Sequence, residues 1–135
     1  MGNKKIQVNA DLCTGCRMCE QVCSLKYTEG EINPKKSCIR VKMNPIIAYD
    51  EPTVCSQCEG QFCMEACPVE AIEMNEATGV LEVNLDQCTG CRLCVSACPE
   101  NAMFMDEEAR KAQKCNLCGG DPKCVKICSL KAISF

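Results

Sequence analysis

The 135-residue chain contains no histidine and no tryptophan, and only two tyrosines and three phenylalanines. Without histidine it lacks the side chain most often used as a general acid or base. It also lacks a glycine-rich dinucleotide fingerprint and a phosphate-binding P-loop. So few aromatic side chains would make a conventional apolar core thin. These absences argue against an enzyme that acts on an organic substrate, and against a domain held together by hydrophobic packing alone.

Long apolar runs are also missing. No segment approaches the ~20 residues that a membrane span requires, and the first residues have neither the apolar stretch of a secretory signal nor paired arginines. We therefore expect a cytoplasmic protein without a membrane span. The formal net charge is −3, so a nucleic-acid partner is not expected.

Cysteine, by contrast, is abundant, with 17 residues. In a reducing compartment so many cysteines favour metal binding over disulfide bonds, and the odd count also argues against a disulfide scaffold. Sixteen of them form four motifs of four. The motifs span residues 13–23, 55–67, 88–98 and 115–128.

The third motif has the most informative spacing, Cys-x2-Cys-x2-Cys-x3-Cys-Pro, which is that of bacterial ferredoxins with [4Fe–4S] clusters. In this arrangement three sulfurs hold one cluster, and the fourth, on the short helix that follows, reaches a neighbouring cluster. Gly90 is expected to let the loop turn with a positive φ. The first motif repeats the Cys-Thr-Gly-Cys-Arg opening of the third.

Structural zinc is the main alternative, because zinc sites also use pairs of cysteines two residues apart. Three thiols within seven residues, in two of the motifs, favour a cube over a single ion. Cys38 belongs to no motif and is expected to be a small buried hydrophobic residue.

Several residues beside the motifs have two interpretations. Arg17 and Arg92 each follow a motif cysteine and either tune a cluster potential or cover a helix surface. Three lysines next to motifs are interpreted as solvated surface charges: Lys26, Lys114 and Lys131. Four apolar residues are expected to keep water off the clusters: Met18, Phe62, Leu93 and Phe104.

The segments between the motifs predict short strands and turns. Strands are expected over residues 6–8, 39–43, 46–49, 71–74, 80–84 and 102–105. Residues 39–49 and 71–84 should form hairpins, residues 27–37 a loop, and residues 106–114 a helix or loop.

Residues after the last cysteine of each motif indicate an internal duplication. The second and third motifs continue Pro-Val-Glu-Ala-Ile and Pro-Glu-Asn-Ala-Met, whereas the first and fourth both continue Ser-Leu-Lys. We therefore predict an α+β fold of two nested ferredoxin-like modules, of βαβ type with small hairpins and short helices. The outer unit would comprise residues 1–50 and 107–135, and the inner unit residues 51–106.

Taken together, the four motifs resemble the four-cluster ferredoxin-like electron-transfer subunits of molybdenum and tungsten oxidoreductases. Such subunits accompany dimethyl-sulfoxide reductase, formate dehydrogenase, tungsten aldehyde oxidoreductase and benzoyl-CoA reductase. The resemblance covers residues 6–135. Its most specific parts are the Cys-x2-Cys-x4-Cys-x3-Cys-Pro second motif and the Cys-Asn-Leu-Cys-Gly-Gly-Asp-Pro-Lys-Cys run of the fourth, which is most similar to the aldehyde-oxidoreductase and benzoyl-CoA-reductase type.

The resemblance implies how the ligands are shared among four [4Fe–4S] clusters. One cluster would be held by Cys13, Cys16, Cys19 and Cys128, and its neighbour by Cys115, Cys118, Cys124 and Cys23. A third would be held by Cys55, Cys58, Cys63 and Cys98, and the fourth by Cys88, Cys91, Cys94 and Cys67. The family places the clusters in a row, with the cluster of the first motif nearest the catalytic subunit.

The implied function is one-electron transfer by a non-catalytic subunit. Its partners would be a catalytic tungsten or molybdenum subunit, and an external carrier such as ferredoxin or a flavin subunit. Two alternatives stay open: a free-standing polyferredoxin that serves several enzymes, and a non-redox assembly protein with structural metal.

Overall fold

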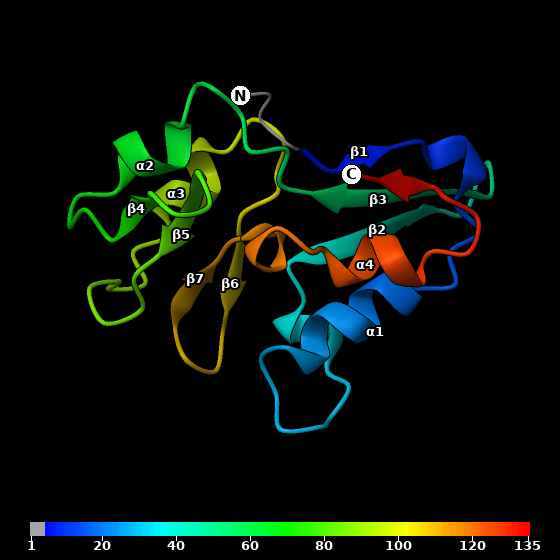
Figure 1. Ribbon diagram of the computed structural model, residues 1–135, viewed down its shortest axis with the longest axis horizontal. Helices are drawn as coiled ribbons and strands as arrows, with labels where there is room; N and C mark the ends of the chain where they lie inside the picture. The colour runs from blue at the N-terminus through cyan, green and yellow to red at the C-terminus, as the bar shows by residue number, and fades with distance from the viewer. Residues whose placement is uncertain (1–4) are drawn as a thin grey trace.

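The computed structural model describes residues 5–135, and its elements are short helices and two-stranded hairpins (Figure 1). The α-helices are α1 (Met18–Leu25), α2 (Phe62–Ala66), α3 (Leu93–Ala97) and α4 (Lys123–Ile127). The 3-10 turns are η1 (Ala10–Leu12), η2 (Pro34–Lys36) and η3 (Leu117–Gly119). None of the helices within residues 5–135 has the length and apolarity that a bilayer span needs.

The strands pair into antiparallel two-stranded sheets. β1 (Gln7–Val8) pairs with β8 (Ile133–Ser134), and β2 (Ile39–Asn44) pairs with β3 (Tyr49–Val54). β4 (Ile72–Asn75) pairs with β5 (Val80–Val83), and β6 (Phe104–Asp106) pairs with β7 (Lys111–Gln113).

The elements gather into two halves (Figure 1). In one half, α1 packs on α4 and β1 lies against β8, so the first and last described segments of the chain are side by side. In the other half, α2 packs on α3 beside the β4–β5 hairpin. The β6–β7 hairpin lies between the two halves in the view of Figure 1.

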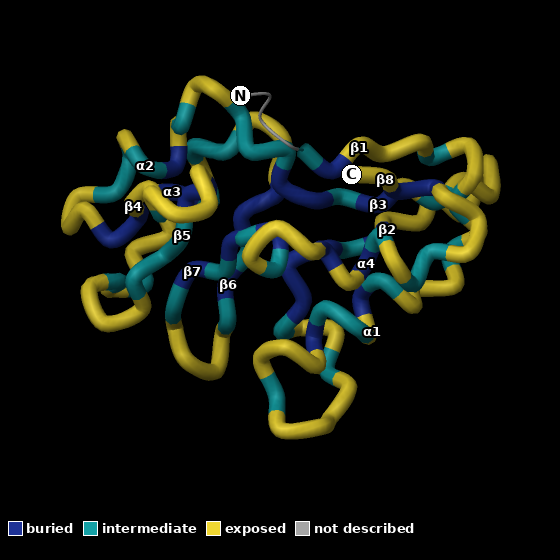
Figure 2. Tube along the Cα trace, viewed as in Figure 1, coloured by how far each residue is buried: buried dark blue, intermediate teal, exposed yellow. Residues whose placement is uncertain are grey.

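Each half has a small apolar cluster in which cysteines take part. Ile39 and Ile133, each 1% exposed, pack with Cys124 in the first half. Ile72 and Met103 pack with Cys63 and Cys94 in the second half. The buried parts of the chain run through the middle of the molecule, whereas the hairpin tips and loops are exposed (Figure 2).

The hairpin predicted over residues 71–84 is confirmed, but the strand predicted over residues 46–49 is wrong. β3 begins only at Tyr49, opposite Asn44, and Ile46 in the turn is 92% exposed. The Asn44 side chain accepts the Ile46 N–H at 3.1 Å and Ala48 has a φ of 49°, so these residues form the turn instead of extending the strand.

Residues 106–114, predicted to be a helix or loop, instead complete the β6–β7 hairpin. The Asp106 carboxylate accepts the N–H groups of Glu108 and Ala109 at 3.1 and 3.2 Å. Arg110 then adopts a φ of 55° and turns the chain back. The charged composition of the segment concealed this turn, because it belongs to the hairpin tip and not to a helix face.

Candidate metal centres

Two glycine-containing loops deliver cysteines to the starts of α1 and α3. Gly15 and Gly90 have φ values of 73° and 77°, which confirms the turn expected at Gly90. Two residues later, Arg17 and Arg92 adopt left-handed conformations with φ of 62° and 67° as the N-caps of the two helices. Each loop therefore curls round its cysteines before the helix begins.

The end of the second and third motifs is built to hydrogen-bond the last cysteine. The Ala71 N–H donates to Cys67 Sγ at 3.2 Å, and the Ala102 N–H donates to Cys98 Sγ at 3.4 Å. In both places the preceding residue has a positive φ, 52° and 54°, which turns the amide toward the sulfur. Hydrogen bonds of this kind stabilise a thiolate and tune a metal bound to it.

Other sulfurs receive backbone N–H groups in the same way. The Gln57 N–H donates to Cys55 Sγ at 3.3 Å, and the Leu117 N–H donates to Cys115 Sγ at 3.4 Å. The Ala112 N–H, from β7, donates to Cys88 Sγ at 3.4 Å.

Three cavities are each lined by four cysteines, three from one motif and one from another. The Cys13 cavity has Cys13, Cys16, Cys19 and Cys128. The Cys55 cavity has Cys55, Cys58, Cys63 and Cys98. The Cys88 cavity has Cys88, Cys91, Cys94 and Cys67. The structure thus brings together three of the four expected ligand sets.

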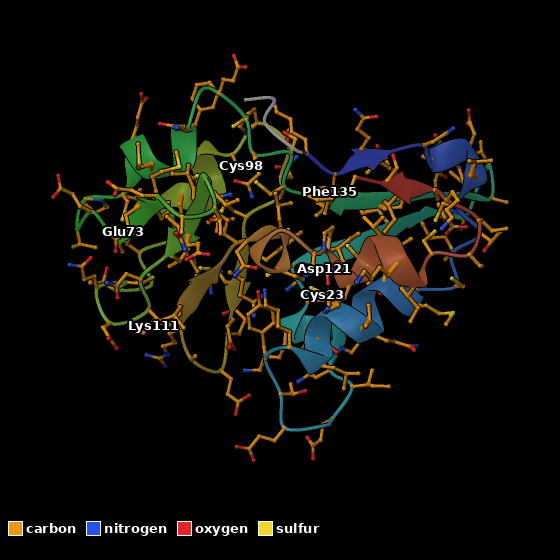
Figure 3. All side chains as sticks on the ribbon, in the orientation of Figure 1. Cys23, Glu73, Cys98, Lys111, Asp121 and Phe135 are labelled. Atoms are coloured by element: carbon orange, nitrogen blue, oxygen red, sulfur yellow. The ribbon has the colours of Figure 1, made fainter. Side chains whose placement is uncertain are left out.

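The fourth expected set, which we call the Cys115 group, comprises Cys115, Cys118, Cys124 and Cys23. Its sulfurs lie close enough for Cys115, Cys23 and Cys118 each to raise the pKa of Cys124 electrostatically, in addition to the larger effect of burial. Figure 3 shows Cys23 in the half that contains α1, and Cys98 beside α3 in the other half.

The donor chemistry of these sets fits iron–sulfur clusters. Each set offers four soft sulfur ligands, and backbone N–H groups donate to sulfurs of the Cys55 cavity, the Cys88 cavity and the Cys115 group. Within residues 5–135 no three His, Cys, Asp or Glu side chains are arranged to hold a single metal ion. In three of the sets the four cysteines line a cavity.

Burial raises the pKa of five of the motif thiols, which are Cys19, Cys63, Cys94, Cys115 and Cys124. It raises the pKa of Cys19 and Cys124 to about 12 and that of Cys94 to about 11. Because the apolar surroundings disfavour a bare thiolate, a bound metal has to supply the positive charge that displaces the proton.

The pKa of Cys23 shifts in the opposite direction and is lowered to about 6. The side chain of Cys38 hydrogen-bonds its sulfur, which outweighs burial, and the Cys38 N–H also donates to it at 3.3 Å. Cys38 itself is 2% exposed, so its predicted burial is confirmed. Its sulfur also lies 3.5 Å from the Tyr27 hydroxyl oxygen.

Three of the apolar residues that are expected to keep water off the clusters are about half-exposed. Met18, Phe62 and Leu93 are 43%, 46% and 49% exposed. They are the first residues of α1, α2 and α3. Met18 and Phe62 line the edges of the Cys13 and Cys55 cavities.

The two arginines differ in what they contact. Arg17 pairs at 3.1 Å with Glu20, whose carboxylate is buried and accepts the Val41 N–H at 2.8 Å. Arg92 pairs with the exposed carboxylate of Glu107. Arg17 therefore supports a buried charge, whereas Arg92 makes a surface ion pair.

The interpretation of Lys114 as a solvated surface charge is wrong. The side chain is buried, with the residue 6% exposed, and its Nζ donates to Cys55 Sγ at 2.9 Å and to Gln57 Oε1 at 3.2 Å. Lys26 and Lys131 are exposed, as expected. The sequence placed Lys114 next to Cys115, but its contact with the second motif, 59 residues away, depends on the fold.

Comparisons with known proteins agree with this chemistry. The family pattern described as a 4Fe-4S dicluster domain matches residues 46–135, and that of a 4Fe-4S binding domain matches residues 10–27.

Individual relatives are similar over most of the chain. The polyferredoxin-like subunit of aliphatic sulfonate oxidoreductase from Pyrococcus furiosus is 43% identical over 91% of this chain and 70% of its own length. A polysulfide reductase subunit from Wolinella succinogenes is 31% identical over 93% of this chain and 71% of its own length. A solved structure, the active site complex BamBC of benzoyl coenzyme A reductase with benzoyl-CoA, contains a chain that is 27% identical, with a TM-score of 0.56 over 96% of this chain and 76% of that one.

Proposed function

Because the chain belongs to the 4Fe-4S dicluster domain family, we propose that it is a non-catalytic electron-transfer subunit of an oxidoreductase complex. When bound, [4Fe–4S] clusters supply one-electron redox chemistry. The chain's own residues bind the clusters, exclude part of the solvent and set their electrostatic surroundings.

The observation that carries this proposal is the composition of the cavities. Each of the three cavities is lined by four cysteines drawn from two motifs. With every cluster held by four cysteines, no iron would offer an open position to a substrate, and electron transfer is the chemistry that remains.

We infer four clusters, with the ligand sets given by the three cavities and the Cys115 group. This sharing supports the nested arrangement, because sulfurs are exchanged between the first and fourth motifs and between the second and third. The packing of α1 on α4 and of α2 on α3 supports it as well. The unit boundaries at residues 50/51 and 106/107 fall in the β2–β3 and β6–β7 hairpins, which would join the two units.

The proposed partner is a catalytic subunit of the tungsten or molybdenum type, in the cytoplasm. The resemblance of the fourth motif and the similarity to the benzoyl coenzyme A reductase complex support this class. Ferredoxin or a flavin subunit would be the external carrier. Leu12, Met18 and Leu130 line the Cys13 cavity and are each over 40% exposed, which supports this end as the one that docks on the catalytic subunit.

Anaerobic purification from the native host tests the proposal. We expect about sixteen iron atoms and sixteen acid-labile sulfides per chain, and copurification with a larger tungsten- or molybdenum-containing subunit. Isolation as an iron-loaded monomer would favour the alternative, a free-standing polyferredoxin. Zinc without sulfide would contradict cluster binding and electron transfer together.

A further inference from the structure

Lys114 carries a positive charge into the interior. Four polar or charged residues are buried in the described chain: Glu20, Ser24, Ser37 and Lys114. Lys114 is the one basic residue among these four. Burying an ammonium costs free energy unless a negative partner compensates it. The position therefore calls for a partner that carries negative charge.

The hydrogen bonds of Lys114 identify that partner. Within residues 5–135 its Nζ donates to one sulfur, Cys55 Sγ, and to one neutral amide oxygen, Gln57 Oε1. Lys36 and Lys126, by contrast, bond the carboxylates of Asp106 and Asp121. The negative charge that compensates Lys114 must then come from the thiolates of the Cys55 cavity and whatever they hold.

Lys114 also lies where two ligand sets meet. It directly precedes Cys115, and Gln57 Nε2, on the same amide that holds the ammonium, donates to the Cys115 carbonyl at 2.7 Å. Lys114 is therefore linked to both sulfur sets through Gln57, but its direct hydrogen bond goes to Cys55.

We propose that Lys114 is a positioning residue that raises the reduction potential of the cluster held in the Cys55 cavity. The proposal rests on the proposed function, since it requires a cluster there. Reduction of that site takes one electron from a one-electron carrier and adds one negative charge, with no bond made or broken. A charge-assisted hydrogen bond in a desolvated site favours the more negative state, so the added electron is stabilised at the junction between the two ligand sets.

The test is a redox titration of the anaerobically purified holoprotein with dithionite and mediator dyes, followed by electron paramagnetic resonance. Lys114→Gln removes the charge, Lys114→Arg keeps it, and Lys35→Gln removes the same charge from an exposed side chain. We expect Lys114→Gln to disfavour reduction of one cluster at least tenfold, which is 59 mV for one electron. Lys114→Arg should restore most of that loss, and Lys35→Gln should leave all potentials in place.

The shifted signal is assigned with Cys58→Ser, which should alter the spectrum of that same cluster. Gln57→Glu provides a second route if the Lys114 variants assemble poorly, because a carboxylate 3.2 Å from Nζ would neutralise the ammonium and lower the same potential. Iron-loaded Lys114→Gln or Gln57→Glu protein with unchanged potentials would overturn the proposal. So would a loss of iron common to Lys114→Gln and Lys114→Arg, which would indicate a structural role. Failure of the proposed function would give a different result from failure of the Lys114 proposal. If the chain is not an electron-transfer subunit, the wild-type protein itself would lack iron or stay redox-silent.

Discussion

The Cys13 cavity and the Cys55 cavity have the same kind of cysteine lining but opposite buried charges nearby. Next to Cys19, the Glu20 carboxylate is 3% exposed and bonds Arg17 and the Val41 N–H. Next to Cys55, the Lys114 ammonium bonds a sulfur directly. We therefore expect the repeated motifs to determine what each cavity binds, and residues that are not repeated to determine how easily each bound group accepts an electron.

The expected consequence is a difference in potential along the protein. A buried carboxylate disfavours an added electron nearby, and a buried ammonium favours it. We therefore expect the site in the Cys13 cavity to be harder to reduce than it would be without Glu20, and the site in the Cys55 cavity to be easier to reduce because of Lys114.

The largest expected effect comes from iron removal, which should unfold the regions around both cavities together. Both apolar clusters include motif cysteines, so neither half has a core independent of the bound groups. Chelation under anaerobic conditions should eliminate most of the native circular dichroism and expose both halves to protease. An apoprotein with native dichroism would contradict a cluster-filled interior, and survival of one half alone would mean that the two regions differ in more than charge.

Gly15 and Gly90 occupy equivalent positions in the cysteine loops of the two halves, so their substitutions can be compared directly. A Cβ at Gly90 would lie 2.3 Å from the Arg110 carbonyl oxygen, which belongs to the backbone, whereas a Cβ at Gly15 would meet the movable Asp50 carboxylate at 2.8 Å. Both substitutions to alanine strain a positive φ, at about 1–3 kcal/mol. We expect Gly90→Ala to cost about 2 kcal/mol more than Gly15→Ala, because it also displaces the hairpin.

The measurement is the urea concentration at which half of the visible cluster absorbance is lost. Gly30→Ala is the matched control, because its φ is 93° and nothing lies within 4 Å of the added Cβ. It therefore reports strain without a clash. Equal losses for Gly90→Ala and Gly30→Ala would refute the clash with Arg110.

These contrasts also mark what the sequence can predict. Cysteine spacing predicts four cluster-binding loops because a loop that wraps a cluster needs fixed intervals, whereas the family resemblance implies which cysteines share a cluster. The positive φ of Gly90 is also predictable, because such a loop has to turn and glycine adopts that conformation without a steric penalty. The place of Lys114 is not predictable, since its contact with Cys55 joins segments 59 residues apart. The 104–113 hairpin escaped prediction because Asp106 forms its turn through backbone contacts that a charged composition does not reveal.

Glu20→Gln should move a potential in the opposite direction from Lys114→Gln. The amide oxygen can still accept the Val41 N–H, so the fold should persist while the charge is lost. Because Arg17 already compensates part of that charge, we expect reduction of one cluster to become more favourable by only about three- to fivefold. Redox titration of Arg17→Gln should give a shift of the opposite sign, and exposed Glu76→Gln should give none. Identical shifts in Glu20→Gln and Glu76→Gln would contradict a local effect.

The smallest expected effect concerns the ion pair between Lys36 and Asp106 at 2.7 Å, which joins the half containing α1 to the β6–β7 hairpin. Burial tends to raise the pKa of Asp106, but hydrogen bonds from Lys36 Nζ and two N–H groups outweigh it and hold that pKa below its ordinary 3.8. A carboxyl group whose pKa is lowered by folding stabilises the folded state at pH values above its ordinary, unfolded-state pKa. This stabilisation is lost as the pH falls through the folded-state pKa. Asp106→Asn should therefore lose its cluster absorbance about two- to fivefold faster in urea at neutral pH, and the difference from wild type should shrink below about pH 4.

Asp121→Asn is the control, because its lysine partners lie within five residues on the same segment and join no separate regions. If Asp121→Asn accelerates the loss as much as Asp106→Asn, the contact with the β6–β7 hairpin contributes nothing beyond an ordinary surface pair.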